Sequence, residues 1–77
     1  MGESTDEEHD LVVTLLQRVY TIAAMEGARG LYRRHLADLA GVDLYRAEVA
    51  IAELVAGGHL VAVDAETVRA GKPFRRP

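Results

Sequence analysis

The chain has 77 residues, of which 49% are hydrophobic and 27% charged, with no cysteine and a formal net charge of −3. These values predict one small folded domain and exclude a disulfide scaffold, a zinc site with thiolate ligands and a cysteine nucleophile. A domain of this size buries about 60% of the surface that its unfolded chain exposes, so we expect a second subunit to add to its stability. No apolar run reaches the roughly 18 residues of a membrane span, and we expect a cytoplasmic protein.

The charges are distributed unevenly along the chain. The first ten residues hold five carboxyl groups and no lysine or arginine, whereas Thr67 to Pro77 hold four basic groups and no acid. Such asymmetry favours an anionic partner, but charged ends also keep a small apolar domain in solution, and the sequence leaves both interpretations open. We predict an acidic flexible leader over residues 1–7, a folded domain over residues 8–71 and a basic flexible tail over residues 72–77.

The segment from Glu8 to Met25 is predicted to be a helix, because its apolar residues recur at spacings of three and four. The predicted inward stripe consists of Val12, Leu15, Leu16, Val19, Ile22 and Ala23. Further apolar residues lie beside the stripe and widen it: Leu11, Val13 and Tyr20. A monomer of this size rarely needs so wide an apolar arc, so we expect a symmetric homodimer through this helix. Alternatively, the extra residues complete the domain's own core.

The glycines at 27 and 30 predict the end of this helix, and Leu31-Tyr32 a short extended stretch. A second helix is predicted over residues 33–40, with an apolar side formed by Leu36, Leu39 and Ala40. Gly41 and Val42 predict a tight turn, after which Asp43 would cap a third helix over residues 44–56. Its predicted inward face comprises Ala47, Ala50, Ile51, Leu54 and Val55.

The hydrophobic period changes after Gly57 and Gly58. Residues 59–63 and 67–70 predict two short strands of a hairpin, joined by a turn at residues 64–66. Phe74 is expected to pack back onto the domain.

Two motifs flank the third helix: Leu-Ala-Asp-Leu-Ala-Gly-Val-Asp precedes it and Leu-Val-Ala-Gly-Gly-His-Leu-Val lies at its end. With these motifs, the residues from Leu36 to Val61 resemble a winged helix-turn-helix domain of small prokaryotic transcription regulators. Gly41 permits the sharp turn between the two helices, Val42 fills the angle, and Ala47 lets the helices approach closely. The resemblance implies a mostly α fold of three helices with a small β-hairpin wing.

The resemblance also implies binding of double-stranded DNA, with the third helix in the major groove and the wing on the backbone. The candidate DNA-binding residues are Arg33, Arg34, Tyr45, Arg46, Val49, Arg69 and Lys72. Tyr45 and Arg46 would face the groove, while the other basic groups would attract phosphates. The third helix departs from the family pattern, because its charged residues are one arginine and two glutamates, and phosphate neutralisation supplies much of DNA affinity.

The second hypothesis is a protein-binding adaptor that uses the same surface, with Leu44, Tyr45 and Val49 as an exposed apolar patch. No enzyme, metal or cofactor is expected. The three histidines, His9, His35 and His59, lack a metal-ligand spacing, and no Lys-Ser or Lys-Thr follows the glycine pair to make a phosphate loop.

Overall fold

The computed structural model describes residues 2–26 and 30–74. It contains three helices, α1 (Gly2–Glu26), α2 (Arg33–Ala40) and α3 (Leu44–Ala56), and three strands, β1 (Leu31–Tyr32), β2 (Leu60–Ala62) and β3 (Thr67–Ala70). The predicted fold class, mostly helical with a small β-hairpin, is confirmed. The predictions for Gly27, Arg29, Arg75 and Arg76 lie outside the described residues.

The sheet has three strands rather than the two of the predicted hairpin. Its order is β1-β3-β2, and both pairings are antiparallel. Leu31 pairs with Val68, and Val61 with Arg69. The extended stretch that precedes α2 therefore joins the wing to the helices.

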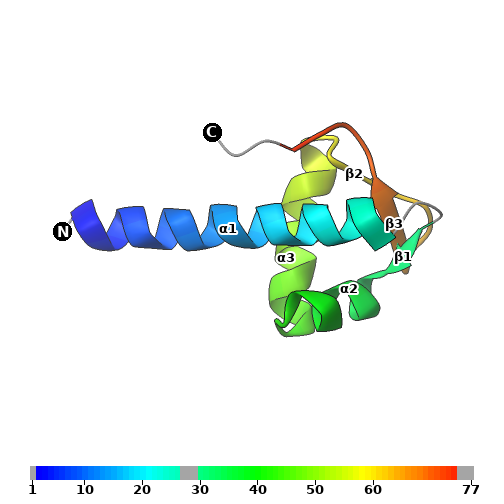
Figure 1. Cartoon of the computed structure of the whole chain (residues 1–77), viewed down its shortest axis with the longest axis horizontal. Coiled ribbons are helices and arrows are strands. Elements are labelled where there is room, and N and C mark those ends of the chain that lie inside the picture. Colours follow the sequence, from blue (N-terminus) through cyan, green and yellow to red (C-terminus); the bar gives the residue numbers. More distant parts are fainter. Residues whose placement is uncertain (1, 27–29, 75–77) are drawn as a thin grey trace.

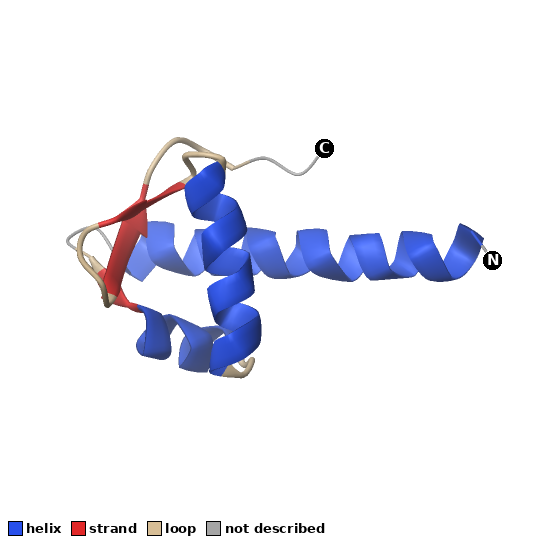
Figure 2. Cartoon of the chain, turned by 180° about the vertical axis from the view of Figure 1, so that it is seen from behind, coloured by secondary structure: helices blue, strands red, loops and turns tan. Residues whose placement is uncertain are grey.

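Figure 1 shows α1 as a long rod that α3 crosses, with α2 and the sheet gathered around the carboxyl half of the rod. The opposite view in Figure 2 shows the same arrangement, and in both views the amino-terminal half of α1 extends clear of the other elements. The molecule measures 42 × 24 × 19 Å along its principal axes. Its length comes from this one helix.

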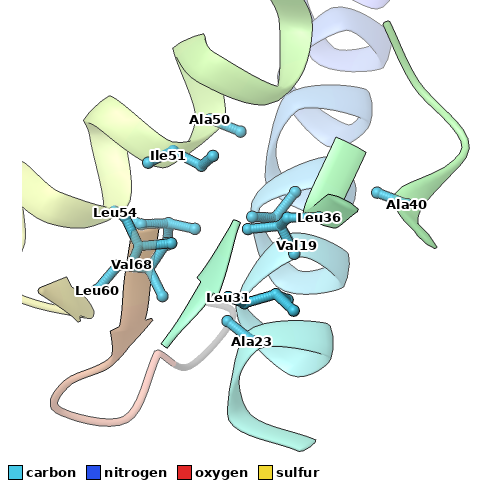
Figure 3. Packing of buried hydrophobic residues seen from close by; sticks show 10 residues of the cluster. All are labelled: Val19, Ala23, Leu31, Leu36, Ala40, Ala50, Ile51, Leu54, Leu60 and Val68. Atoms are coloured by element: carbon cyan, nitrogen blue, oxygen red, sulfur yellow. The ribbon is translucent and has the colours of Figure 1, made fainter. Parts of the chain in front are cut away.

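The core lies between the carboxyl half of α1, the two shorter helices and the inner face of the sheet (Figure 3). Every layer contributes a fully buried aliphatic side chain, and the largest are Val19, Leu36, Ile51, Leu54, Leu60 and Val68. At the Leu-to-Ala cost of about 2–5 kcal/mol for a buried side chain, any one of them carries a large part of the stability of so small a domain.

The α1 helix corrects two predictions. It begins at Gly2, so the residues expected to form a flexible leader belong to the helix; acidic residues favour a helix amino terminus through the helix dipole. Its predicted core stripe also has one wrong member, because Val13 is buried, whereas Val12 is 53% exposed. The other five predicted members lie in the core or pack against it: Leu15, Leu16, Val19, Ile22 and Ala23.

The α2 helix corrects one further core assignment. Leu39 is 45% exposed, and Ala37 is buried in its place beside Leu36 and Ala40. The eight-residue helix packs against both α1 and α3, and these two contacts decide which of its residues are buried.

The turn between α2 and α3 is built as predicted. Gly41 ends α2 in the left-handed conformation, with φ of 73°, which a residue with a side chain adopts only at a cost. The carboxylate of Asp43 accepts a hydrogen bond of 2.8 Å from the backbone N–H of Arg46 and so caps α3. Val42 is half-buried against the core.

The segment after β3 folds back onto the domain. The N–H groups of Gly71 and Lys72 donate to the carbonyls of His59 and Gly58, at 2.7 and 3.0 Å. The ring of Phe74 lies edge-on to His59, with centroids 5.0 Å apart, and 6.2 Å from Tyr20. The prediction for Phe74 is confirmed, and Lys72 to Phe74 belong to the folded domain rather than to a flexible tail.

Candidate functional site

Two depressions flank the outward surface of α3 in the described part of the chain. The first, which we name the charged hollow, has a volume of about 500 Å³ and lies among the start of α2, the first turns of α3 and the turn between β2 and β3. It is lined by Tyr32, Arg33, Arg34, His35, Asp38, Leu44, Glu48, Ala65 and Glu66.

The second, which we name the apolar groove, has a volume of about 580 Å³ and separates α1 from α3. It is lined by Leu11, Val12, Thr14, Leu15, Leu16, Arg18, Val42, Tyr45, Arg46, Val49, Ala50 and Glu53.

Basic groups and carboxylates alternate in the charged hollow. The basic side chains come from consecutive residues at the start of α2, and Arg34 and His35 are exposed. The carboxylates come from three different elements: Asp38, Glu48 and Glu66. With three carboxylates against two arginines and a histidine, the hollow as a whole offers a polyanion no excess of positive charge, and attraction depends on the most exposed basic groups.

Arg33 connects α2 to the turn of the wing. Its backbone N–H donates to the carbonyl of Glu66 at 2.9 Å, and its side chain is half-buried. Among the described residues, its buried Nε has no hydrogen-bond partner. Arg33 is thus placed to hold the wing, and Arg34 is the more accessible of the two arginines.

The tip of the wing is acidic and locally ordered. One carboxylate oxygen of Asp64 accepts hydrogen bonds from the N–H groups of Glu66 and Thr67, at 2.8 and 2.9 Å. The hydrogen bond from Glu66, then those from Thr67, hold the pKa of Asp64 below its usual value. The turn therefore presents negative charge where a wing would meet DNA.

The apolar groove has two exposed aliphatic and aromatic walls. Leu11 and Val12 form the α1 wall and are 71% and 53% exposed, while Tyr45 and Val49 form the α3 wall and are 77% and 51% exposed. Large apolar side chains that lie together on a surface mark contact sites for other molecules.

Two arginines line the same groove. Arg18 donates from Nη1 to the carbonyl of Ala40, at 3.3 Å. The Nε of Arg46 lies 4.0 Å from a carboxylate oxygen of Asp43, and both side chains are exposed. An exposed pair at this distance contributes little to stability, so the charge of Arg46 can still act on a partner.

The structure separates the predicted DNA-binding residues. Arg33 and Arg34 line the charged hollow, whereas Tyr45, Arg46 and Val49 line the apolar groove. Arg69 lies on β3, opposite Val61, and lines neither depression. Lys72 lies beyond the carboxyl end of α3, where its side chain passes over Gly58.

The predicted protein-binding patch is divided in the same way, because Leu44 lines the charged hollow, whereas Tyr45 and Val49 line the apolar groove. Sequence reasoning missed His35, Glu66 and Val12 as members of these surfaces. His35 directly follows the two arginines, which was the available signal for it. Val12 carried no distinguishing signal, because it fits a core stripe as well as an exposed one.

Two observations bear on other kinds of site within the described residues. No three His, Cys, Asp or Glu side chains come close enough together to hold a metal ion. No helix there combines the length and hydropathy needed to cross a membrane.

Comparison with known proteins gives no relative: no protein-family model, curated protein or solved structure matches the chain.

Proposed function

We propose that the chain is a DNA-binding protein of the winged-helix type, a small cytoplasmic transcription regulator that meets duplex DNA through the charged hollow and the exposed start of α3. The observation that supports this is the placement of Arg34 and His35 beside the outward surface of α3 and the wing turn. In helix-turn-helix proteins the helix before the recognition helix crosses the phosphate backbone while the recognition helix reads base edges.

Each group in the hollow has a role in this proposal. Arg34 attracts a phosphate, and Arg33 positions the wing. Leu44 meets a thymine methyl group, and Glu48 accepts from a cytosine amino group, both of which are known contacts in the major groove. Arg69 and Lys72 lie outside the hollow and add a long-range attraction.

The carboxylates of the hollow limit the affinity. Asp38, Glu48 and Glu66 lie within the same depression as Arg34, and each of them repels phosphates. We therefore expect modest non-specific affinity with a shallow salt dependence, because the salt slope grows with the number of neutralised phosphates and only a few are neutralised here.

The test is fluorescence anisotropy with a random duplex of about 30 base pairs, which spans two half-sites one helical turn apart. The wild type is titrated across a salt series beside Arg34→Ala and Arg46→Ala. The two variants are a matched pair, because both arginines are exposed and each lies in the first turn of a helix, Arg34 in α2 and Arg46 in α3. Arg34→Ala should weaken binding to all duplexes alike and lower the salt slope by about 1.

Arg46→Ala serves as the control for the apolar-groove side and should leave the salt slope for random duplex nearly unchanged. Its effect on sequence preference is then measured on selected duplexes. Equal losses for the two variants would contradict the assignment of phosphate contact to the hollow. Absence of binding at low salt would overturn the DNA proposal itself.

A second candidate function is a protein-binding adaptor, and the apolar groove favours it. Tyr45 and Val49 are exposed on the outward side of α3, where a DNA-reading helix commonly carries polar groups that hydrogen-bond to bases. If the wild type fails to bind DNA, this candidate replaces the first. Val49→Glu should then abolish capture of the partner while the fold stays intact.

A further inference from the structure

We propose that the apolar groove is the interface between two copies of this chain, related by a two-fold axis that crosses α1 at the level of Val13. The two α1 helices lie antiparallel, and each enters the groove of the other copy. This inference gives a geometry to the dimer that the sequence predicts. It stands whether or not the protein binds DNA, and it competes with the adaptor hypothesis because both need the same groove.

The first argument is the shape of the molecule. The amino-terminal half of α1 projects past α3 in both views (Figures 1 and 2). Leu11 and Val12 lie exposed in the α1 wall of the groove. A helix segment without tertiary contacts gains little stability in water. A second α1, lying along the first, would cover this α1 wall and the facing wall of Tyr45 and Val49.

The second argument is the register that the axis imposes. In an antiparallel pair centred on residue 13, Leu11 of one copy lies at the level of Leu15 of the other, so the apolar residues of both helices meet at the centre. By the same rule Glu8 lies at the level of Arg18.

The third argument is charge complementarity. The α1 segment before Leu11 holds five carboxyl groups and no basic residue, and the groove is lined by Arg18 and Arg46. An occupant of this groove needs an apolar centre and an acidic end. The α1 helix itself has both, in the order that the antiparallel register requires.

A two-fold arrangement also closes the assembly. Because the same patch is used on both copies, two grooves are filled at once and no groove is left to recruit a third chain. A stable interface of this kind buries about 800 Å² on each partner. The charged hollow, on the other side of α3, stays open on both copies.

The experiment measures oligomeric mass by light scattering at about 100 μM, with the dissociation constant taken from a dilution series. The wild type should have the mass of two chains. Val49→Glu places a carboxylate in the interface and should raise the dissociation constant by about 100-fold or more, as loss of an interface hot spot does.

Val63→Glu is the matched control. Val63 is 50% exposed, close to the 51% of Val49, and it lies on the wing outside the groove. Its variant should dimerise as the wild type does. Circular dichroism checks that both variants remain folded.

A charge exchange tests the register. Arg18→Glu should weaken the dimer about 10-fold, and the double variant Arg18→Glu with Glu8→Arg should recover most of that loss. A monomeric wild type, a mass above two chains, equal effects of the two valine variants, or no recovery in the double variant would each overturn the proposal. Because no DNA is present, these outcomes are separate from those of the anisotropy test.

Discussion

The two sides of α3 differ in chemistry although they belong to one thirteen-residue helix. On the side of the charged hollow, Leu44 and Glu48 lie among the basic and acidic side chains of α2 and the wing. On the side of the apolar groove, Tyr45 and Val49 face the aliphatic wall of α1. Residues adjacent in the sequence therefore serve different surfaces.

The difference shows why the predicted DNA-binding set does not form one site. Successive residues of a helix point about 100° apart, so Leu44 lines the charged hollow while the adjacent Tyr45 lines the apolar groove. The exposed basic groups of the charged hollow attract a polyanion, whereas the apolar groove favours an apolar helix. The two roles are compatible on α3 only if the two sides act independently.

The strongest test of that independence is the effect of Val49→Glu on DNA binding. If the variant is monomeric, its affinity for a duplex with two half-sites should fall by about 100-fold, because two linked sites bind with avidity that a single site lacks. The salt slope per bound protomer should stay unchanged, since no phosphate contact is removed. A reduced slope per protomer would show that Val49 lies on the DNA-binding side after all.

A gain-of-function variant tests whether the wing turn beside the charged hollow approaches DNA. Glu66→Lys replaces repulsion at the wing turn with attraction and should strengthen binding to random duplex about 10-fold at low salt, with a steeper salt slope. The dimer mass should not change, because Glu66 lies outside the apolar groove. Unchanged DNA affinity in this variant would show that the wing turn does not approach the backbone.

Asp43→Ala tests the element that both sides share. The carboxylate of Asp43 caps α3 through the N–H of Arg46, and its loss should cost about 1 kcal/mol of stability, or about 4–8 °C in Tm for a domain of this size. Arg46→Ala, measured beside it by thermal unfolding, removes the ion pair but keeps the cap. A similar loss in both variants would assign the effect to the pair instead.

The smallest expected effect concerns the ordered turn of the wing. The pKa of Asp64 is lower in the folded chain than in the unfolded chain, so its charge stabilises the fold above the unfolded pKa of about 3.9. That contribution is lost as the pH falls through the folded pKa. Asp64→Asn should therefore be slightly less stable than the wild type at pH 7 and should approach it in strongly acidic buffer.

Urea unfolding at neutral and acidic pH measures the difference between these two proteins. Glu66→Gln is the control, because it removes the same charge from the same turn. If Asp64→Asn and the wild type differ equally at both pH values, the hydrogen bonds of the turn do not depend on the charge of Asp64.

The sequence by itself determined the turn between α2 and α3, the cap of α3 and the inward face of α3, because these features depend on residues close together in the chain. Gly41 and Asp43 predicted the turn and the cap, and the structure has both, because a left-handed φ and a free N–H at a helix start are needs of the immediate chain. The inward face of α3 was also predictable, since its buried residues Ala47, Ala50, Ile51 and Leu54 follow one helical period.

The tertiary structure alone decided which apolar residues of α1 are buried and which surfaces the site residues join. Val12 and Val13 are the same residue type at neighbouring positions, and only the tertiary packing buries Val13 and leaves Val12 in the groove. Likewise, Arg34 and Glu66 are far apart in the chain, and the pairing of β1 with β3 brings them into one hollow. Such choices depend on contacts between distant segments, which the helical period of a single segment does not encode.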